Sequence, residues 1–145
     1  MLNEVVFHIY PTDCDMLGHL NHATMLNFLE RARWALLEDQ TRLKDWNRAD
    51  AFPVVRHVDI SYVAQSLPGE DLAIRSGLFA VRNTSYIVRQ DVRKVGSGIL
   101  VAEATIVFVA VNQRGEKVPV PEAWTTSLEH WPGDEEDADN AAAAR

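Results

Sequence analysis

One stretch of helical periodicity, set among β-type segments, constrains this chain more than any other feature. From His22 to about Asp39, apolar residues recur at intervals of three and four: Met25, Phe28, Leu29, Ala32 and Leu36. The apolar face is widened further by Leu26, Trp34, Ala35 and Leu37. A helix that is apolar over most of its circumference is typical of a buried position. We therefore expect one long central helix, around which the other elements are arranged.

β-Type segments account for most of the remaining chain. The pattern predicts one strand before the helix, over 4–10, and four strands after it, over 53–63, 72–81, 85–95 and 99–111. The turn sequences Leu-Pro-Gly-Glu at 67–70 and Gly-Ser-Gly at 96–98 separate some of them. A short helix is expected around Glu122–Glu129. The order indicates an α+β fold, in which a five-stranded antiparallel sheet, with its last four strands in a meander, wraps around the helix.

The length of 145 residues corresponds to a single domain. We place the folded domain at 1–131. The segment 132–145 is polar, with five acids and one base over 134–145, and we expect it to be a disordered tail. In the strand over 99–111 both faces are largely apolar, which argues for a second covering layer, most simply another subunit.

Charge and composition exclude several classes of partner. The net charge is −7, and nothing resembles the basic face that nucleic-acid binding requires. No apolar run reaches the roughly 18 residues of a membrane span. The N-terminus carries Glu4 where a signal peptide would be basic. A single cysteine, Cys14, forms no internal disulfide, which fits a reducing cytoplasm. We expect a cytoplasmic protein that binds no nucleic acid and does not insert into a membrane.

Polar residues concentrate in the loop 13–22, between the first strand and the start of the helix. Asn21 is a suitable N-cap, because its side chain can bond an unpaired N–H of the first turn. A helix N-terminus can stabilise an oxyanion, and a nearby carboxylate can attack a carbonyl or activate water. Asp13 and Asp15 are such carboxylates, although on the loop composition alone their simpler interpretation as loop and capping residues is the stronger one.

Three other interpretations of this loop are weaker. A phosphotransferase with an aspartate nucleophile requires Thr or Val two residues after the second Asp, where this chain has Leu17. His19 and His22 with Asp15 lack a third firm ligand for a metal. Cys14 has no identifiable base to make it a nucleophile. We therefore expect no metal site.

The run from Thr12 to Arg33, TDCDMLGHLNHATMLNFLERAR, resembles the signature of the 4-hydroxybenzoyl-CoA thioesterase family of hotdog-fold proteins. That signature has an Asp-x-Asp loop, a glycine, a polar stretch and an apolar helix ending in Glu-x-Ala-Arg, here Glu30 to Arg33. The segment 52–72, the Arg82-x-x-Ser85 pattern and the sequence Val-Pro-Val-Pro at 118–121 fit as well. The resemblance covers about residues 3–130 and implies the hotdog fold.

The resemblance also implies roles for residues of the loop and the helix. Asp15 corresponds to the catalytic carboxylate, the backbone N–H of His22 to the group that polarises the thioester carbonyl, and Gly18 to a point of close backbone approach. His19 and Asn21 would contact the substrate. A role of His19 and His22 in assisting water or binding acyl oxygens stays open. Glu30 either faces the acyl pocket or pairs with Arg33 on the helix surface.

A second segment corresponds to the coenzyme A site of the family. It consists of Arg82, Asn83, Thr84 and Ser85, which would meet the phosphates or the pantetheine arm, although a solvated turn explains Arg82 equally well. Coenzyme A is part of the substrate, so no separate cofactor is expected. The sequence His19-Leu20-Asn21 replaces bulky residues of some relatives, so the acyl preference cannot be transferred.

We therefore predict an acyl-CoA thioesterase, assembled as a homodimer or a dimer of dimers, with Asp15 as nucleophile or general base. One alternative is a hotdog protein that binds an acyl or aryl ligand without catalysis. Such a protein has no need of a carboxylate beside the carbonyl. A second alternative is a hotdog enoyl-CoA hydratase. Its Asp-x-Asn-Pro-x-His pattern is not matched here, because Leu17-Gly18 replaces Asn-Pro.

Overall fold

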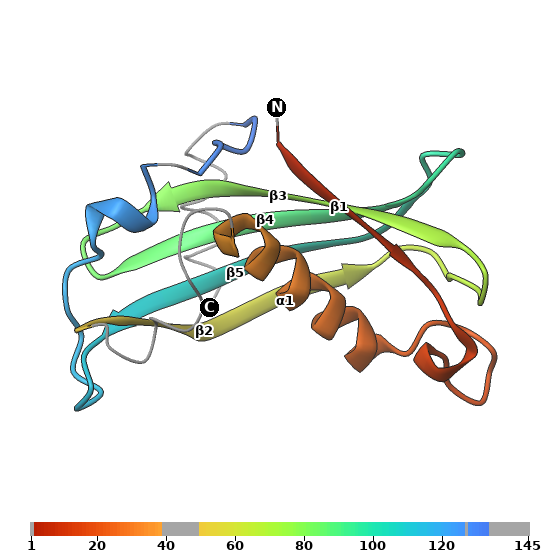
Figure 1. Cartoon of the computed structure of the whole chain (residues 1–145), viewed down its shortest axis with the longest axis horizontal. Helices are drawn as coiled ribbons and strands as arrows, with labels where there is room; N and C mark the ends of the chain where they lie inside the picture. The colour runs from red at the N-terminus through yellow and green to blue at the C-terminus, as the bar shows by residue number, and fades with distance from the viewer. Residues whose placement is uncertain (1, 39–49, 127, 134–145) are drawn as a thin grey trace.

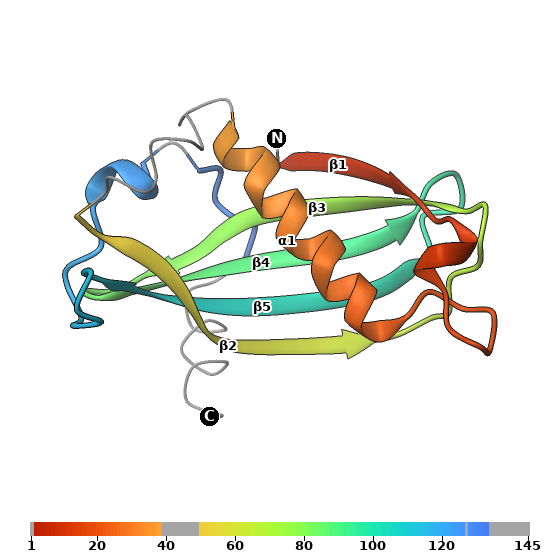
Figure 2. The same ribbon diagram turned by 60° about the horizontal axis from the view of Figure 1, so that its bottom comes forward.

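The computed structural model describes residues 2–38, 50–126 and 128–133 (Figure 1). One helix and five strands make up most of it. In chain order they are β1 (Asn3–His8), the 3-10 turn η1 (Pro11–Asp13), α1 (His22–Glu38), β2 (Phe52–Tyr62), β3 (Asp71–Val81), β4 (Ser85–Lys94), β5 (Leu100–Val111) and the 3-10 turn η3 (Glu122–Trp124). All strand pairs are antiparallel, and α1 lies across one face of the curved sheet (Figures 1 and 2). The hotdog architecture is therefore confirmed.

The predicted meander of four strands is wrong in one respect. The sheet order is β1-β3-β4-β5-β2, so only β3, β4 and β5 follow one another as hairpins. β1 occupies the outer side of β3, which leaves the outer side of β5 as the place where β2 can pair. The connection over 63–70 therefore crosses one end of the sheet, and β2 becomes an edge strand (Figure 2).

The helix is buried on one side only. Met25, Phe28, Leu29 and Ala32 face the sheet and are almost fully buried. On other sides of α1, Leu26 and Trp34 are 38% and 40% exposed, so the expected burial of most of its circumference is wrong for the single chain. Helices within the described ranges do not combine the length and hydrophobicity that crossing a bilayer requires.

The C-terminal segment covers part of the opposite face of the sheet. Trp131 packs on a small buried cluster formed by Phe79, Ala80, Ile87 and Val107. Hydrogen bonds from the Leu78 N–H to Glu129 O (2.8 Å) and from the Trp131 N–H to Leu78 O (2.7 Å) attach this segment to β3. Part of the predicted second layer thus comes from the chain itself.

The predicted helix over 122–129 is only the turn η3, and most of the predicted tail, 134–145, lies outside the described residues.

A buried polar network joins the middle of α1 to the sheet. Gln90, fully buried on β4, donates from Nε2 to Leu29 O and to Ser76 Oγ, both at 2.9 Å. Its Oε1 accepts a hydrogen bond from Arg33 Nη1 at 3.0 Å. Arg33 also lies over the Phe108 ring, and burial lowers the pKa of its guanidinium. One glutamine therefore satisfies three partners in the core.

We predict that Gln90→Leu, which roughly keeps the volume, destabilises the fold by about 3 kcal/mol, because it leaves buried polar groups unpaired, the Arg33 guanidinium among them. The measurement is urea unfolding at fixed protein concentration. Gln113→Leu is the control, since Gln113 is exposed in the turn after β5 and its replacement should be near neutral. A loss below about 1 kcal/mol for Gln90→Leu would show that the network contributes little.

Candidate active site

The loop before α1 folds as a small hairpin. Cys14 and Leu20 form a β-bridge, and the Asp15 N–H donates to His19 O at 2.9 Å. The Gly18 N–H donates to Asp15 O at 3.0 Å and closes a four-residue turn. Gly18 has φ +80°, a conformation that residues with a Cβ rarely adopt. Its conformation places Asp15 at the base of the hairpin.

Asn21 caps the helix as predicted. Its Oδ1 accepts hydrogen bonds from the Ala23 N–H at 2.8 Å and from the Thr24 N–H at 3.3 Å. The Met25 N–H donates to Asn21 O. For the N–H of His22, the first residue of α1, we find no acceptor among the described residues. The cap therefore leaves one N–H of the first turn available, at the positive end of the helix dipole.

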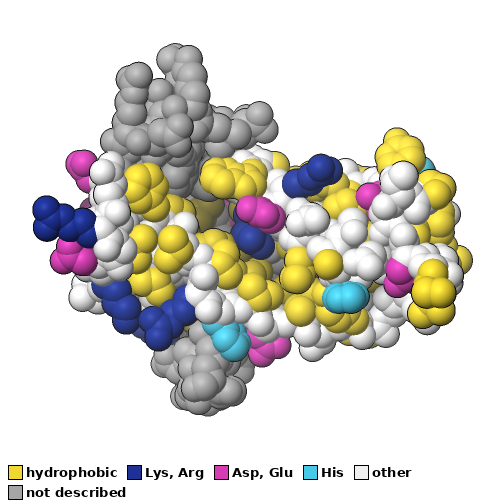
Figure 3. Space-filling model, turned by 90° about the horizontal axis from the view of Figure 1, so that it is seen from below, with side chains coloured by type: hydrophobic (Ala, Val, Ile, Leu, Met, Phe, Trp, Pro, Cys, Tyr) yellow, Lys and Arg dark blue, Asp and Glu magenta, His cyan; other side chains and the backbone are white. Residues whose placement is uncertain are grey.

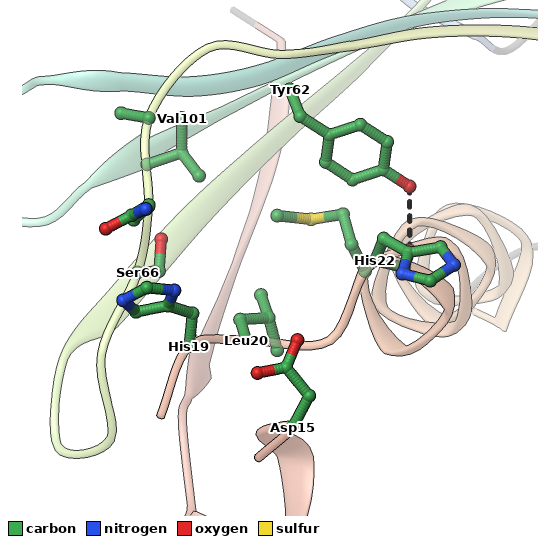
Figure 4. A pocket seen from close by; sticks show the side chains of 10 residues that line it. Asp15, His19, Leu20, His22, Tyr62, Ser66 and Val101 are labelled. Carbon is green, nitrogen blue, oxygen red and sulfur yellow. Dashed lines mark hydrogen bonds between the residues drawn. The ribbon is translucent and has the colours of Figure 1, made fainter. Parts of the chain in front are cut away.

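Three segments that are distant in sequence enclose a cavity of about 210 Å³ at this end of the helix (Figure 4). Hydrogen bonds connect them: the Leu20 N–H donates to Ser66 O at 2.8 Å, and the Val63 N–H donates to Val101 O at 2.7 Å. The walls are partly apolar and partly polar. The lining residues are Asp15, His19, Leu20, His22, Met25, Tyr62, Ala64, Gln65, Ser66 and Val101.

The Asp15 carboxylate has one restrained oxygen and one available oxygen. Oδ1 accepts a hydrogen bond from the Leu17 N–H at 2.9 Å, an interaction within the loop. For Oδ2 the described residues supply no hydrogen-bond donor. Figure 4 shows the carboxylate directed toward the cavity. Asp13 has a different role, because its Oδ2 accepts from the Tyr10 N–H at 2.9 Å and stabilises the start of the loop.

Tyr62, at the end of β2, contacts the start of the helix. Its hydroxyl donates to His22 O at 2.7 Å, and its ring lies edge-on to the His22 ring (Figure 4). Partial burial raises the pKa of Tyr62, so the hydroxyl stays a donor at neutral pH. This bond fixes one wall of the cavity relative to the helix N-terminus.

Cys14 lies beside the site but is unsuited to nucleophilic attack. Burial raises the pKa of its thiol, and the charges of Asp13 and Asp15 raise it further. The thiol is therefore protonated at neutral pH. Among the described residues, no three His, Cys, Asp or Glu side chains come close enough to hold a metal ion.

The structure does not bring all predicted site residues together. Asp15, His19 and His22 line the cavity, whereas Gly18 and Asn21 only shape the loop and the cap. Glu30 lines a separate cavity of about 180 Å³ between α1 and β2, together with Arg33. Burial lowers the pKa of Arg33, and the charge of Glu30 offsets part of this lowering. Glu30 and Arg33 thus share a cavity that is separate from the one with Asp15, and the choice between the two roles of Glu30 stays a prediction.

Residues 82–85 lie far from Asp15 within one chain. They form the turn between β3 and β4, at the end of the sheet opposite the loop before α1 (Figure 1). The Arg82 N–H donates to Ser85 O at 2.7 Å, which closes this turn. Because β3 has 11 residues, roughly 35 Å of strand separates the two segments.

Sequence reasoning missed Tyr62 and Ser66. Tyr62 stands at the end of a predicted strand, and a polar aromatic residue at that point could have suggested a role. Ser66 gave no signal, because a serine in a connection next to Pro68-Gly69 is typical of any loop. Both reach the site through contacts that are distant in sequence.

The model of the thioesterase-like superfamily matches residues 9–128 of this chain. The long-chain acyl-CoA thioesterase FadM of Escherichia coli is 31% identical over 103 residues, which cover 71% of this chain and 78% of FadM. The solved structure of YbaW, a probable thioesterase from Escherichia coli, has a TM-score of 0.75 at 26% identity, covering 83% of this chain and 90% of YbaW.

A more distant relative shows the fold alone. The 1,4-dihydroxy-2-naphthoyl-CoA thioesterase from Synechocystis has a TM-score of 0.80 at 18% identity, covering 88% of this chain and 95% of its own. The narrower 4-hydroxybenzoyl-CoA group stays a prediction. The extent of the family match and the identity to FadM establish that this chain belongs to the thioesterase-like superfamily.

Proposed function

We propose that this protein hydrolyses acyl-CoA thioesters at the cavity beside the helix N-terminus. One observation carries the proposal. A carboxylate oxygen of Asp15 and the N–H of His22, neither of which has a hydrogen-bond partner among the described residues, lie at the same cavity. A thioester carbonyl requires both groups, an electrophilic contact at oxygen and a base or nucleophile near carbon. The names of the relatives, which are thioesterases, support the same reaction.

In the proposed mechanism the thioester oxygen accepts a hydrogen bond from the His22 N–H. The helix dipole stabilises the negative charge that develops on this oxygen. Asp15 Oδ2 then either attacks the carbonyl carbon or removes a proton from an attacking water. In the first route the coenzyme A thiolate leaves, and water hydrolyses the resulting anhydride. Both routes consume one water and yield a carboxylic acid and free coenzyme A.

A homodimer through β2 would complete the site. β2 is an edge strand, and its Val54, Val55 and Val58 are 42%, 50% and 38% exposed. A long exposed apolar edge is suited to pairing with another chain. The side of the molecule seen in Figure 3 carries hydrophobic side chains over much of its length. Antiparallel pairing of two β2 strands gives one continuous sheet with a two-fold axis.

This pairing also explains why residues 82–85 resemble a coenzyme A site. Antiparallel β2 strands bring the far end of the partner's sheet to the end of this sheet that holds Asp15. The partner's turn between β3 and β4 then lies about three strand spacings from β2 of this subunit, roughly 15 Å across the sheet. An extended pantetheine arm spans such a distance, so the partner subunit's Arg82 can meet the phosphates. A further pairing into a dimer of dimers is compatible with this arrangement.

We predict that Asp15→Asn lowers turnover of an acyl-CoA by at least ~10²-fold, because it removes the basicity of the catalytic carboxylate. The asparagine keeps an oxygen for the bond from the Leu17 N–H, so the loop should stay folded. Steady-state release of free thiol measures the effect, with circular dichroism as the check on folding.

Asp13→Asn is the matched control for this variant, since it keeps an acceptor for the Tyr10 N–H and does not face the cavity. Its turnover should stay within a few-fold of wild type. If folded Asp15→Asn retains more than about a tenth of wild-type turnover, the proposed role of Asp15 is wrong.

A second prediction concerns the sharing of the site between subunits. Asp15→Asn and Arg82→Ala should each be strongly impaired, but co-refolding them in equal amounts should restore about a quarter of wild-type turnover, because half of the dimers are mixed and each has one intact site. Refolding either variant alone is the control. Mixed dimers without any recovery of turnover would exclude a site built from two subunits.

A further inference from the structure

Ser66 has a buried hydroxyl for which the described residues supply no hydrogen-bond partner. The residue is 2% exposed, and its Oγ is one of two buried side-chain polar atoms in the described ranges without a hydrogen-bond partner. Buried hydroxyls in native proteins are almost always paired, since an unpaired one costs the desolvation of the group. An unpaired hydroxyl on the wall of a cavity therefore indicates a partner that enters the cavity.

The position of Ser66 is well determined by its backbone. Its carbonyl accepts the Leu20 N–H at 2.8 Å, which attaches the connection over 63–70 to the loop before α1. Ser66 lines the same cavity as Asp15 and His22. In Figure 4 Ser66 and Val101 lie on one side of the cavity, beside His19, whereas His22 lies on the opposite side.

This placement separates the reacting centre from Ser66. In the proposed dimer the pantetheine arm approaches from the partner beyond β2, so with the thioester carbonyl between Asp15 and the His22 N–H we assign the acyl group to the side of the cavity that holds Ser66. A water activated by Asp15 lies at Asp15 and not at the opposite wall. The surface near Ser66 combines apolar Leu20, Met25, Ala64 and Val101 with two polar side chains, the half-buried His19 and the exposed Gln65. Among these polar groups the Ser66 hydroxyl is the fully buried one without a partner in the described residues, and such a group selects a polar atom in a largely apolar ligand.

We propose that the Ser66 hydroxyl binds an oxygen substituent of the acyl group, so that this enzyme prefers hydroxyl- or keto-bearing acyl thioesters over their unsubstituted counterparts. The inference rests on the proposed thioesterase function and specifies its substrate class. A site that offers a hydrogen bond to a substrate oxygen discriminates against the analogue that lacks the oxygen, because the buried hydroxyl is then left unpaired.

The test compares matched pairs of acyl-CoAs that differ only in one oxygen: a hydroxyl on C2, a hydroxyl on C3, a keto group on C3, or a hydroxyl on an aromatic ring. For each pair kcat/KM is measured with wild type and with Ser66→Ala. In at least one pair we expect wild type to favour the oxygenated substrate, and Ser66→Ala to reduce this preference about tenfold, the size expected for one neutral hydrogen bond. For the unsubstituted substrate kcat/KM should change less than about threefold.

Ser76→Ala is the matched control. Ser76 is equally buried, but its Oγ accepts the hydrogen bond from Gln90 in the core and does not line the cavity. Ser76→Ala should lower the Tm and leave the substrate preference unchanged. Ser66→Ala should leave the Tm unchanged or raise it, because no internal hydrogen bond is lost. A clear fall in Tm for Ser66→Ala would show an internal partner and overturn the premise.

Two kinetic outcomes overturn the proposal. One is a preference that Ser66→Ala leaves intact, or the absence of any preference in all pairs. The other is an equal loss of kcat/KM on both members of a pair, which assigns the hydroxyl to water or to a part common to both substrates. If wild type hydrolyses no acyl-CoA, the proposed function fails by itself. In that case the Kd of each oxygenated acyl-CoA is compared with the Kd of its unsubstituted counterpart, in wild type and in Ser66→Ala. A ratio that Ser66→Ala leaves unchanged would overturn the inference.

Discussion

The hydrogen bonds of one buried glutamine determine how the helix lies on the sheet, and the position of the active site follows from them. Apolar contacts between α1 and the sheet are not directional, so they alone would tolerate rotation or sliding of the helix. Gln90 bonds Leu29 O on the helix and Ser76 Oγ on β3, and it accepts from Arg33 one turn further along. These bonds form at only one rotation of the helix about its axis and at one position of the helix along the sheet.

The start of the helix is fixed separately, by bonds of the loop that precedes it. Leu20 bonds the backbone of Ser66, and Tyr62 bonds the His22 carbonyl, so the first turn is held against the end of β2 and the connection that follows it. Asn21 satisfies the N–H groups of Ala23 and Thr24 through its side chain. The N–H of His22 is left without an acceptor among the described residues, while the cap bonds its neighbours. The same cap that stabilises the helix thus sets the direction of the proposed oxyanion contact.

The local sequence pattern predicted the helix and the strands well, but it could not predict which strands pair with each other. Helical spacing and turn residues placed α1 and each strand within two residues of the observed bounds, and Asn21 was identified because capping is a local interaction. The position of β2 beside β5 depends on which strand edges remain unoccupied, which no local pattern contains. Glu30 matched a family motif, yet one helical turn places it beside Arg33 in a different cavity. Ser66 is recognised only when its burial and missing partner are known.

In the proposed dimer, the β2 edge of the sheet would serve both assembly and substrate recognition. β2 ends at Tyr62, which lines the cavity, and its earlier residues Val54, Val55 and Val58 are exposed. A partner that covers this edge therefore approaches the cavity along the same strand. In one chain the loop with Asp15 and the turn over 82–85 lie at opposite ends of the sheet, and the proposed two-fold axis beside β2 would bring such ends together. The proposed dimer would account for both features at once, because the subunit that buries β2 would also bring its own residues 82–85 toward the cavity with Asp15.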